Sequence, residues 1–177
     1  MKSTTKIVIV AGHSKVGKTM LCYSLAGEIP PPSPPPTIGI DFKICKVNDE
    51  KLLIYEIVNE HRFSGSIVQY VIRANVLIVM YSVLSIDTVK TAESIMANMP
   101  DKKRKFLVGN LFGSDTETDR CAHCAATILA EDYGMIHIVV DTKTGKGVHS
   151  LRASIEGVFQ ADELNQKKEL QKSCIIT

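Results

Sequence analysis

The sequence predicts a three-layer α/β domain built on a six-stranded, mostly parallel β-sheet. Short apolar runs of strand length alternate along the chain with segments of helical periodicity. Because helices separate most of these runs, the strands are expected to pair in parallel through right-handed crossovers. The 177 residues, 45% of them hydrophobic, are enough for one domain with a substantial core.

The elements can be assigned in chain order. Strands are expected over residues 6–11, 39–47, 51–58, 76–83, 105–110 and 135–141, and helices over 18–27, 65–73, 86–99, 119–132 and 147–165. Residues 48–50 form a short polar turn, which predicts a hairpin and hence an antiparallel pair. The last helix has an amphipathic stripe with spacings of three and four, made of Val148, Leu151, Ile155 and Val158.

We therefore expect one domain over residues 1–165 and a flexible polar tail over residues 166–177.

The composition excludes several classes of protein. A net charge of +2 lacks the footprint of a nucleic-acid-binding protein, so no nucleic-acid partner is expected. The N-terminal segment does not resemble a secretory signal, and the longest apolar run, residues 76–83, is far shorter than a membrane span. Five cysteines, an odd number, indicate reduced thiols in the cytosol.

Residues 12–19, Gly-His-Ser-Lys-Val-Gly-Lys-Thr, match G-x-x-x-x-G-K-[S/T] between the first strand and the first helix. Glycines let the backbone curl so that successive N–H groups point inward, and the helix adds the positive end of its dipole. Lys18 is then expected on the outer phosphates of a nucleotide, and the Thr19 hydroxyl on Mg²⁺. The motif predicts a phosphate-binding loop at the carboxyl edge of the sheet.

Residues 37–42, Thr-Ile-Gly-Ile-Asp-Phe, begin 18 residues after Thr19. Together with the phosphate-binding motif and the strand–helix order, they make the chain resemble a small GTPase of the Ras superfamily, nearest the Rab branch. The resemblance covers nearly the whole chain. It implies the P-loop GTPase fold, GTP or GDP as ligand with Mg²⁺, and a membrane-anchored switch in vesicle traffic or signalling that binds effector and regulator proteins.

The resemblance also assigns candidate site residues. Those expected to bind nucleotide are Gly12, His13, Ser14, Lys15, Val16, Gly17, Lys18, Thr19, Met20, Thr37, Asn110, Thr142 and Lys143. Those expected to hold Mg²⁺ are Thr19, Thr37 and, through water, Glu56.

The second switch departs from the family pattern W-D-T-A-G-Q-E-R-F, with which residues 55–63 align. Glu56 replaces an Asp and keeps its charge. Asn59 replaces a glycine whose N–H meets the γ-phosphate, and its Cβ predicts crowding. Glu60 stands at the catalytic position, where the family glutamine orients the attacking water, and its charge is repelled by the phosphate. Hydrolysis is therefore expected to be slow, with His61 a surface residue rather than a catalyst.

The base-reading motif N-K-x-D is incomplete. Asn110 is present, but residues 111–113 are Leu-Phe-Gly, so the lysine and the aspartate that accepts hydrogen bonds from guanine are missing. Asp115 follows two residues later, and it could take the place of the missing aspartate only if the loop bulged. Pro30 takes the place of the aromatic residue that packs on guanine, while residues 142–145 resemble the last base-contacting loop. Guanine selectivity is expected to be poor.

Residues 30–36, Pro-Pro-Pro-Ser-Pro-Pro-Pro, form a polyproline II segment that is either a stiff loop or a ligand for an aromatic groove. The sequence Cys121-Ala-His-Cys124 lacks the second pair that a zinc site requires. We interpret it as part of a buried helical stripe made of Cys121, Cys124, Ala125, Ile128 and Leu129.

The chain ends in Cys174-Ile-Ile-Thr, which fits the prenylation pattern C-a-a-X. Lipidation of Cys174 would place the protein on the cytosolic face of a membrane, with a cytoplasmic pool. Two alternatives to a cycling GTPase stay open: a pseudo-GTPase scaffold that binds nucleotide weakly or without cycling, and a phosphotransferase that uses ATP.

Overall fold

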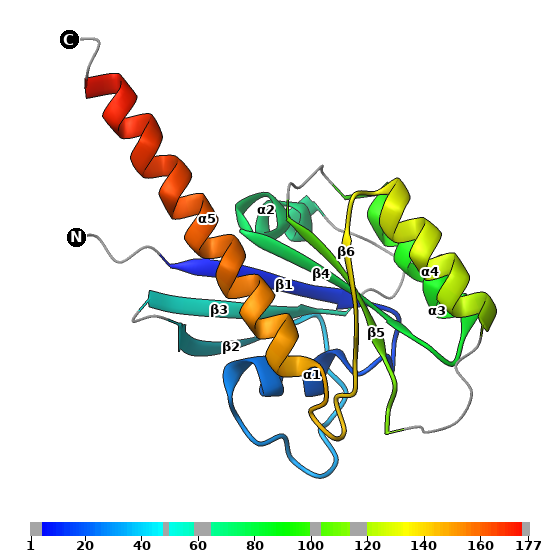
Figure 1. Cartoon of the computed structure of the whole chain (residues 1–177). Coiled ribbons are helices and arrows are strands. Elements are labelled where there is room, and N and C mark those ends of the chain that lie inside the picture. The colour runs from blue at the N-terminus through cyan, green and yellow to red at the C-terminus, as the bar shows by residue number, and fades with distance from the viewer. Residues whose placement is uncertain (1–4, 48–49, 59–64, 100–103, 114–119, 175–177) are drawn as a thin grey trace.

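A computed structural model of the chain describes residues 5–47, 50–58, 65–99, 104–113 and 120–174. In these residues six strands and five helices occur in the expected order and confirm the three-layer α/β fold (Figure 1). The elements are β1 (Lys6–Gly12), α1 (Lys18–Ala26), β2 (Ile40–Val47), β3 (Glu50–Ile57), α2 (Gly65–Arg73), β4 (Val76–Ser82), α3 (Ile86–Ala97), β5 (Lys105–Asn110), α4 (Arg120–Asp132), β6 (Ile136–Val140) and α5 (Val148–Cys174).

The sheet has the order β2-β3-β1-β4-β5-β6. Only the hairpin pair β2–β3 is antiparallel among the described strands, and the other pairs are parallel. At the centre, Val8 of β1 lies opposite Ile54 of β3 on one side and Val76 of β4 on the other. The strand order reverses at β1, between β3 and β4. Such a switch point opens a crevice at the carboxyl ends of the strands, which is where the phosphate-binding motif lies.

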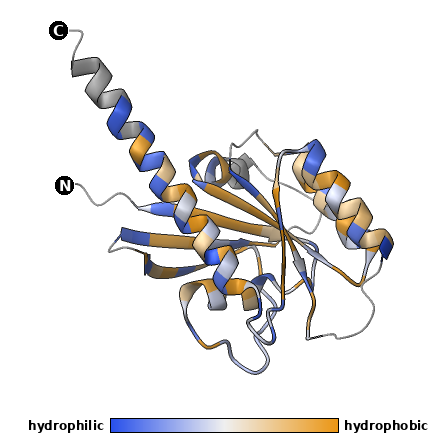
Figure 2. Ribbon diagram, viewed as in Figure 1, coloured by the Kyte–Doolittle hydropathy of each residue, from blue (hydrophilic) through white to orange (hydrophobic). Residues whose placement is uncertain are grey.

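Two apolar clusters pack on the two faces of the sheet. Helices α1 and α5 cover one face, where their apolar residues pack on those of β1 and β3. Helices α2, α3 and α4 cover the other face (Figure 1). The strands are largely apolar, as Figure 2 shows. The stripe predicted for the last helix is confirmed, because Val148, Leu151, Ile155 and Val158 are all buried.

The stripe predicted for α4 is wrong at Cys121, Cys124 and Ile128 and confirmed at Leu129. Cys121 and Cys124 are exposed, and Ile128 is 59% exposed. The buried face is instead Ala122, Ala126, Leu129 and Ala130. Small alanines let α4 approach α3 and the sheet closely, so Ala122, Ala126 and Ala130 face inward beside Leu129. None of the described cysteines forms a disulfide.

Helix α5 is longer than the helix expected over residues 147–165, since it continues to Cys174. Lys6 of β1 contacts Glu163 at 2.9 Å and Glu50 at 3.4 Å, and Arg104 contacts Asp162 at 3.1 Å. These ion pairs hold the middle of α5 against the sheet. Beyond them the helix runs away from the body (Figure 1), and the next coloured turn is mostly hydrophilic (Figure 2). In the described part of the chain, no helix is both long and apolar enough to cross a membrane.

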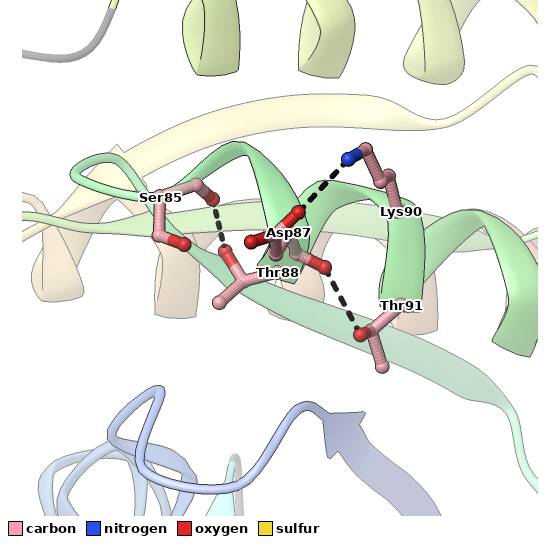
Figure 3. A network of polar contacts seen from close by, with 5 residues as sticks. All are labelled: Ser85, Asp87, Thr88, Lys90 and Thr91. Atoms are coloured by element: carbon pink, nitrogen blue, oxygen red, sulfur yellow. Dashed lines mark hydrogen bonds and ion pairs between the residues drawn. The ribbon is translucent and has the colours of Figure 1, made fainter.

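Helix α3 begins with a polar network (Figure 3). The Thr88 hydroxyl donates to the Ser85 carbonyl at 2.7 Å and accepts from the Ser82 N–H at 2.9 Å. Asp87, in the first turn, complements the helix dipole and pairs with Lys90 at 2.9 Å. Because Asp87 and Lys90 are both exposed, this pair contributes little to stability.

Candidate nucleotide-binding site

The loop between β1 and α1 needs glycine at two of its positions. Gly12 has a φ of 149°, and a Cβ there would lie 2.4 Å from the Met80 carbonyl oxygen of β4. Gly17 has a φ of 91°, and a Cβ there would lie 2.3 Å from Asn110 Nδ2. Lys15 also has a positive φ, 62°. Consecutive turns of this kind make a concave nest of N–H groups that suits an anion.

Lys18 is the first residue of α1, and it is buried. Its Nζ donates to the His13 carbonyl oxygen at 2.9 Å, so the side chain folds back across the mouth of the loop. A buried ammonium group at the amino end of a helix adds positive charge where the helix dipole is already positive. This part of the site favours a polyphosphate ligand.

The three candidate metal ligands come together beside the loop. The Thr19 hydroxyl donates to Glu56 Oε1 at 2.8 Å and lies 3.5 Å from the Thr37 hydroxyl. Two hydroxyls and one carboxylate are oxygen donors of the kind that Mg²⁺ prefers. Thr19, Thr37 and Glu56 therefore fit a magnesium ion, which would neutralise phosphate charge when bound.

A pocket of about 320 Å³ lies over these groups. The phosphate loop and α1 form its floor, and the proline segment forms one wall. The wall residues are Pro34, Pro35 and Pro36, directly before Thr37. This position supports the interpretation of the proline run as a stiff loop of the site, because its residues line the cavity next to the candidate metal ligands.

Asn110 ends β5 and joins three loops although it is completely buried. Its Nδ2 donates to the Val16 carbonyl at 3.0 Å and to the Thr142 hydroxyl at 2.9 Å. Its Oδ1 accepts from the Thr142 N–H at 3.1 Å and from the Phe112 N–H at 3.3 Å. Asn110 therefore fixes the phosphate loop relative to the two loops in which the base site is predicted, and Thr142 acts through this contact.

The two base-site loops are also joined by Asp141, which the sequence did not single out. Its Oδ1 accepts from the N–H groups of Gly113 and Lys143, each at 2.9 Å, and its Oδ2 accepts from the Thr144 hydroxyl at 2.7 Å. Burial acts to raise the pKa of the Asp141 carboxyl, but these hydrogen bonds outweigh burial and hold the pKa below its ordinary value. An acidic residue directly after an apolar run of strand length was the signal available in the sequence.

The remaining candidates fall in different places. His13, Ser14, Val16 and Met20 belong to the phosphate loop or the first turn of α1. Cys174 is the last residue of α5. Residues 59–61, which include Asn59, Glu60 and His61, and Asp115 lie outside the described residues.

Fold and loop together define a P-loop nucleotide-binding protein. The Ras family model matches residues 6–157. Ras-related protein Rab-18-B of Danio rerio is 28% identical over 172 residues, which cover 91% of this chain and 82% of that protein. Ras-related protein RABE1e of Arabidopsis thaliana is 28% identical over 156 residues, covering 84% and 72%. Ras-related protein Rab-18 of Lymnaea stagnalis is 25% identical over 171 residues, covering 91% and 84%. The chain belongs to the Ras family and is a Rab-like small GTPase.

Proposed function

We propose that the protein is a nucleotide-dependent switch in vesicle traffic or signalling, with Mg²⁺ as cofactor and slow intrinsic hydrolysis. The observation that carries this proposal is the convergence of Thr19, Thr37 and Glu56 beside the phosphate loop. Thr37 reaches the site from the segment after the prolines, and Glu56 reaches it from β3. A γ-phosphate and Mg²⁺ would bind both segments at once, and their loss would release both. Such ordering is how this class of switch operates.

The surface next to these segments supports a protein partner. Phe42 of β2, Tyr55 of β3 and Tyr70 of α2 form a row, with ring centroids 6.1 and 5.2 Å apart. Phe42 is 53% exposed and Tyr70 is 39% exposed. Exposed aromatic side chains of this kind are typical of protein interfaces. Tyr55 directly precedes Glu56, so we propose that effectors and regulators sense the nucleotide through this row.

The pattern at Cys174 supports a prenyl anchor on the cytosolic face of a membrane. Helix α5 carries this cysteine away from the sheet (Figure 1). One lipid chain gives only weak, reversible membrane binding. Residues 162–174 hold three lysines but also three acidic residues, so electrostatic support from the tail is small. We propose a protein that exchanges between membrane and cytoplasm.

Nucleotide binding tests the core of the proposal. Lys18→Ala and Thr19→Asn are each expected to weaken binding of Mg²⁺-GDP by about tenfold or more, since each removes a charged or metal-linked contact of roughly 1.5–3 kcal/mol. Isothermal calorimetry with the purified chain measures this effect, and chelation of Mg²⁺ should reduce binding to the unmodified chain. Lys90→Ala is a matched control, because Lys90 is exposed on α3 and its ammonium group pairs with Asp87 (Figure 3). Unchanged affinity in both loop variants would rule out the switch.

Single-turnover hydrolysis of bound GTP separates a slow enzyme from a pseudo-GTPase scaffold. The unmodified chain is expected to hydrolyse GTP more slowly than its Asn59→Gly/Glu60→Gln variant, because two groups act against the attacking water. Glu60→Gln alone should restore less activity than the pair of substitutions. Tight binding without hydrolysis in any variant would favour the scaffold, and rapid hydrolysis by the unmodified chain would show that Glu60 does not hinder the reaction.

A further inference from the structure

The side chain of Lys143, an exposed residue, passes beside the position that should carry the guanine-reading carboxylate. Gly113 aligns with the aspartate of the base motif and has a φ of 72°. A Cβ built on Gly113 would lie 2.7 Å from Cδ of Lys143 and 3.6 Å from its Cε. The aliphatic chain of Lys143 therefore crosses the space that the first atoms of an aspartate side chain would occupy. The ammonium group follows one bond beyond Cε.

This replacement reverses the hydrogen-bonding character of the site. An aspartate accepts hydrogen bonds, so it selects a base that presents N–H donors, as guanine does at N1 and at its 2-amino group. A lysine has three donors and no acceptor. Where guanine carries the 2-amino group, xanthine carries a carbonyl oxygen. Lysine can donate to that oxygen and would leave the guanine amino group unpaired.

Asp141, a carboxylate in the described part of this region, is already engaged. Asp141 already accepts hydrogen bonds from Gly113, Lys143 and Thr144 within its own loop. Leu111, which replaces the lysine of the base motif, packs against the apolar cluster of α3 and α4. Phe112, with a φ of 56°, lies against the phosphate loop and would come within 3.4 Å of a Cβ on Gly17. The side chains of Leu111 and Phe112 carry no hydrogen-bond acceptor.

We propose that Lys143 is the specificity-determining residue of the base site, and that it selects a purine with a carbonyl group at position 2, such as xanthine, over guanine. This inference rests on the proposed nucleotide binding at the phosphate loop. It concerns only the base, so the phosphate and metal contacts are expected to be the same for every nucleotide.

Competition binding of XDP, GDP and ADP, with pyrophosphate as a ligand that lacks a base, tests the inference. The unmodified chain should bind XDP more tightly than GDP or ADP. Lys143→Ala should weaken XDP by about tenfold to a hundredfold, which is the range for a hydrogen bond from a charged group, and leave pyrophosphate unchanged. Lys146→Ala is the matched control, since Lys146 is an exposed lysine of the same loop whose backbone carbonyl and N–H make its hydrogen bonds within the described residues.

A second variant tests the same position in the opposite direction. Gly113→Asp with Lys143→Ala restores the carboxylate and removes the side chain in its way. Aspartate tolerates the left-handed backbone of Gly113 better than most residues. This double variant should prefer GDP over XDP.

The outcomes separate the two proposals. A preference of the unmodified chain for GDP overturns the role of Lys143 and makes Asp115 the next candidate acceptor. Equal weakening of XDP and pyrophosphate by Lys143→Ala would show that the lysine contacts phosphate instead. Failure of every nucleotide and of pyrophosphate to bind would overturn the proposed function as well.

Discussion

Asn110 should contribute to stability far more than its single side chain suggests. It is completely buried, and its amide group joins Val16, Phe112 and Thr142 of three separate loops. Asn110→Ala leaves the Val16 carbonyl and the Thr142 N–H without this partner, and both residues are buried. Each buried polar group left unsatisfied costs about 1–3 kcal/mol, so the free energy of unfolding should fall by roughly 2–6 kcal/mol.

Urea unfolding, monitored by circular dichroism with and without added nucleotide, measures this loss in the free energy of unfolding. The nucleotide-free protein reports the structural role, and the gain in stability on adding nucleotide reports affinity through linkage. Nucleotide should stabilise Asn110→Ala less than the unmodified chain, because the phosphate loop is no longer held at Val16. Thr142→Val removes the hydroxyl that contacts Nδ2 and Oδ1 of Asn110, at 2.9 and 3.2 Å, and should lower the free energy of unfolding by about 1 kcal/mol.

Asn98→Ala is the matched control. Asn98 also donates from its Nδ2 to a carbonyl, that of Ser94 at 2.7 Å, but it is exposed, and water can replace the lost contact. Its substitution should change the free energy of unfolding by less than about 0.5 kcal/mol. If Asn110→Ala were as mild as Asn98→Ala, the three loops would be held by other contacts and the argument for Asn110 would be refuted.

Two further predictions concern the membrane and pH. Cys174→Ser should move the membrane-bound fraction of the protein to the cytoplasm in cell fractionation, whereas Cys121→Ser, at an exposed cysteine of α4, should not; retention of Cys174→Ser on membranes would exclude the lipid anchor. Burial, and then the nearby charge of His123, lower the pKa of His137, so the unfolded chain binds more protons and stability should fall as pH drops below about 6.5. His137→Gln should flatten this dependence in urea unfolding between about pH 7.5 and 5.5, and an unchanged slope would assign it to other groups.

The layers and the phosphate loop could be predicted because their signals are local. The phosphate loop is one contiguous motif between a strand and a helix, so its glycines, lysine and threonine can be recognised in the sequence before its distant partner Asn110 is known. The strands are short apolar runs. On α5 the apolar residues Val148, Leu151, Ile155 and Val158 mark one face of the helix, and no second face competes with it. In such segments periodicity alone determines which side faces the core.

Helix α4 shows where that reasoning fails. Its alanines and cysteines allow two apolar stripes one residue apart, and hydropathy favoured the one with Cys121, Cys124 and Ile128. Ala122 and Ala126 face the core instead, because α4 packs closely beside α3 and small side chains permit the closer approach. Size, which decides packing, is not visible in a pattern of hydrophobic and polar residues.

The base site could be only half predicted, because its decisive contact joins two loops that are far apart in sequence. The loss of the aspartate at Gly113 was visible, and it predicted a weakened preference for guanine. Sheet order brings the end of β5 beside the end of β6, and Lys143 then reaches across Gly113. A glycine facing an uncharged loop would leave a pocket without preference. A glycine with a lysine side chain beside it gives a pocket with N–H donors. Substitution of Lys143, rather than of Gly113, therefore shows whether selectivity for a base is lost or altered.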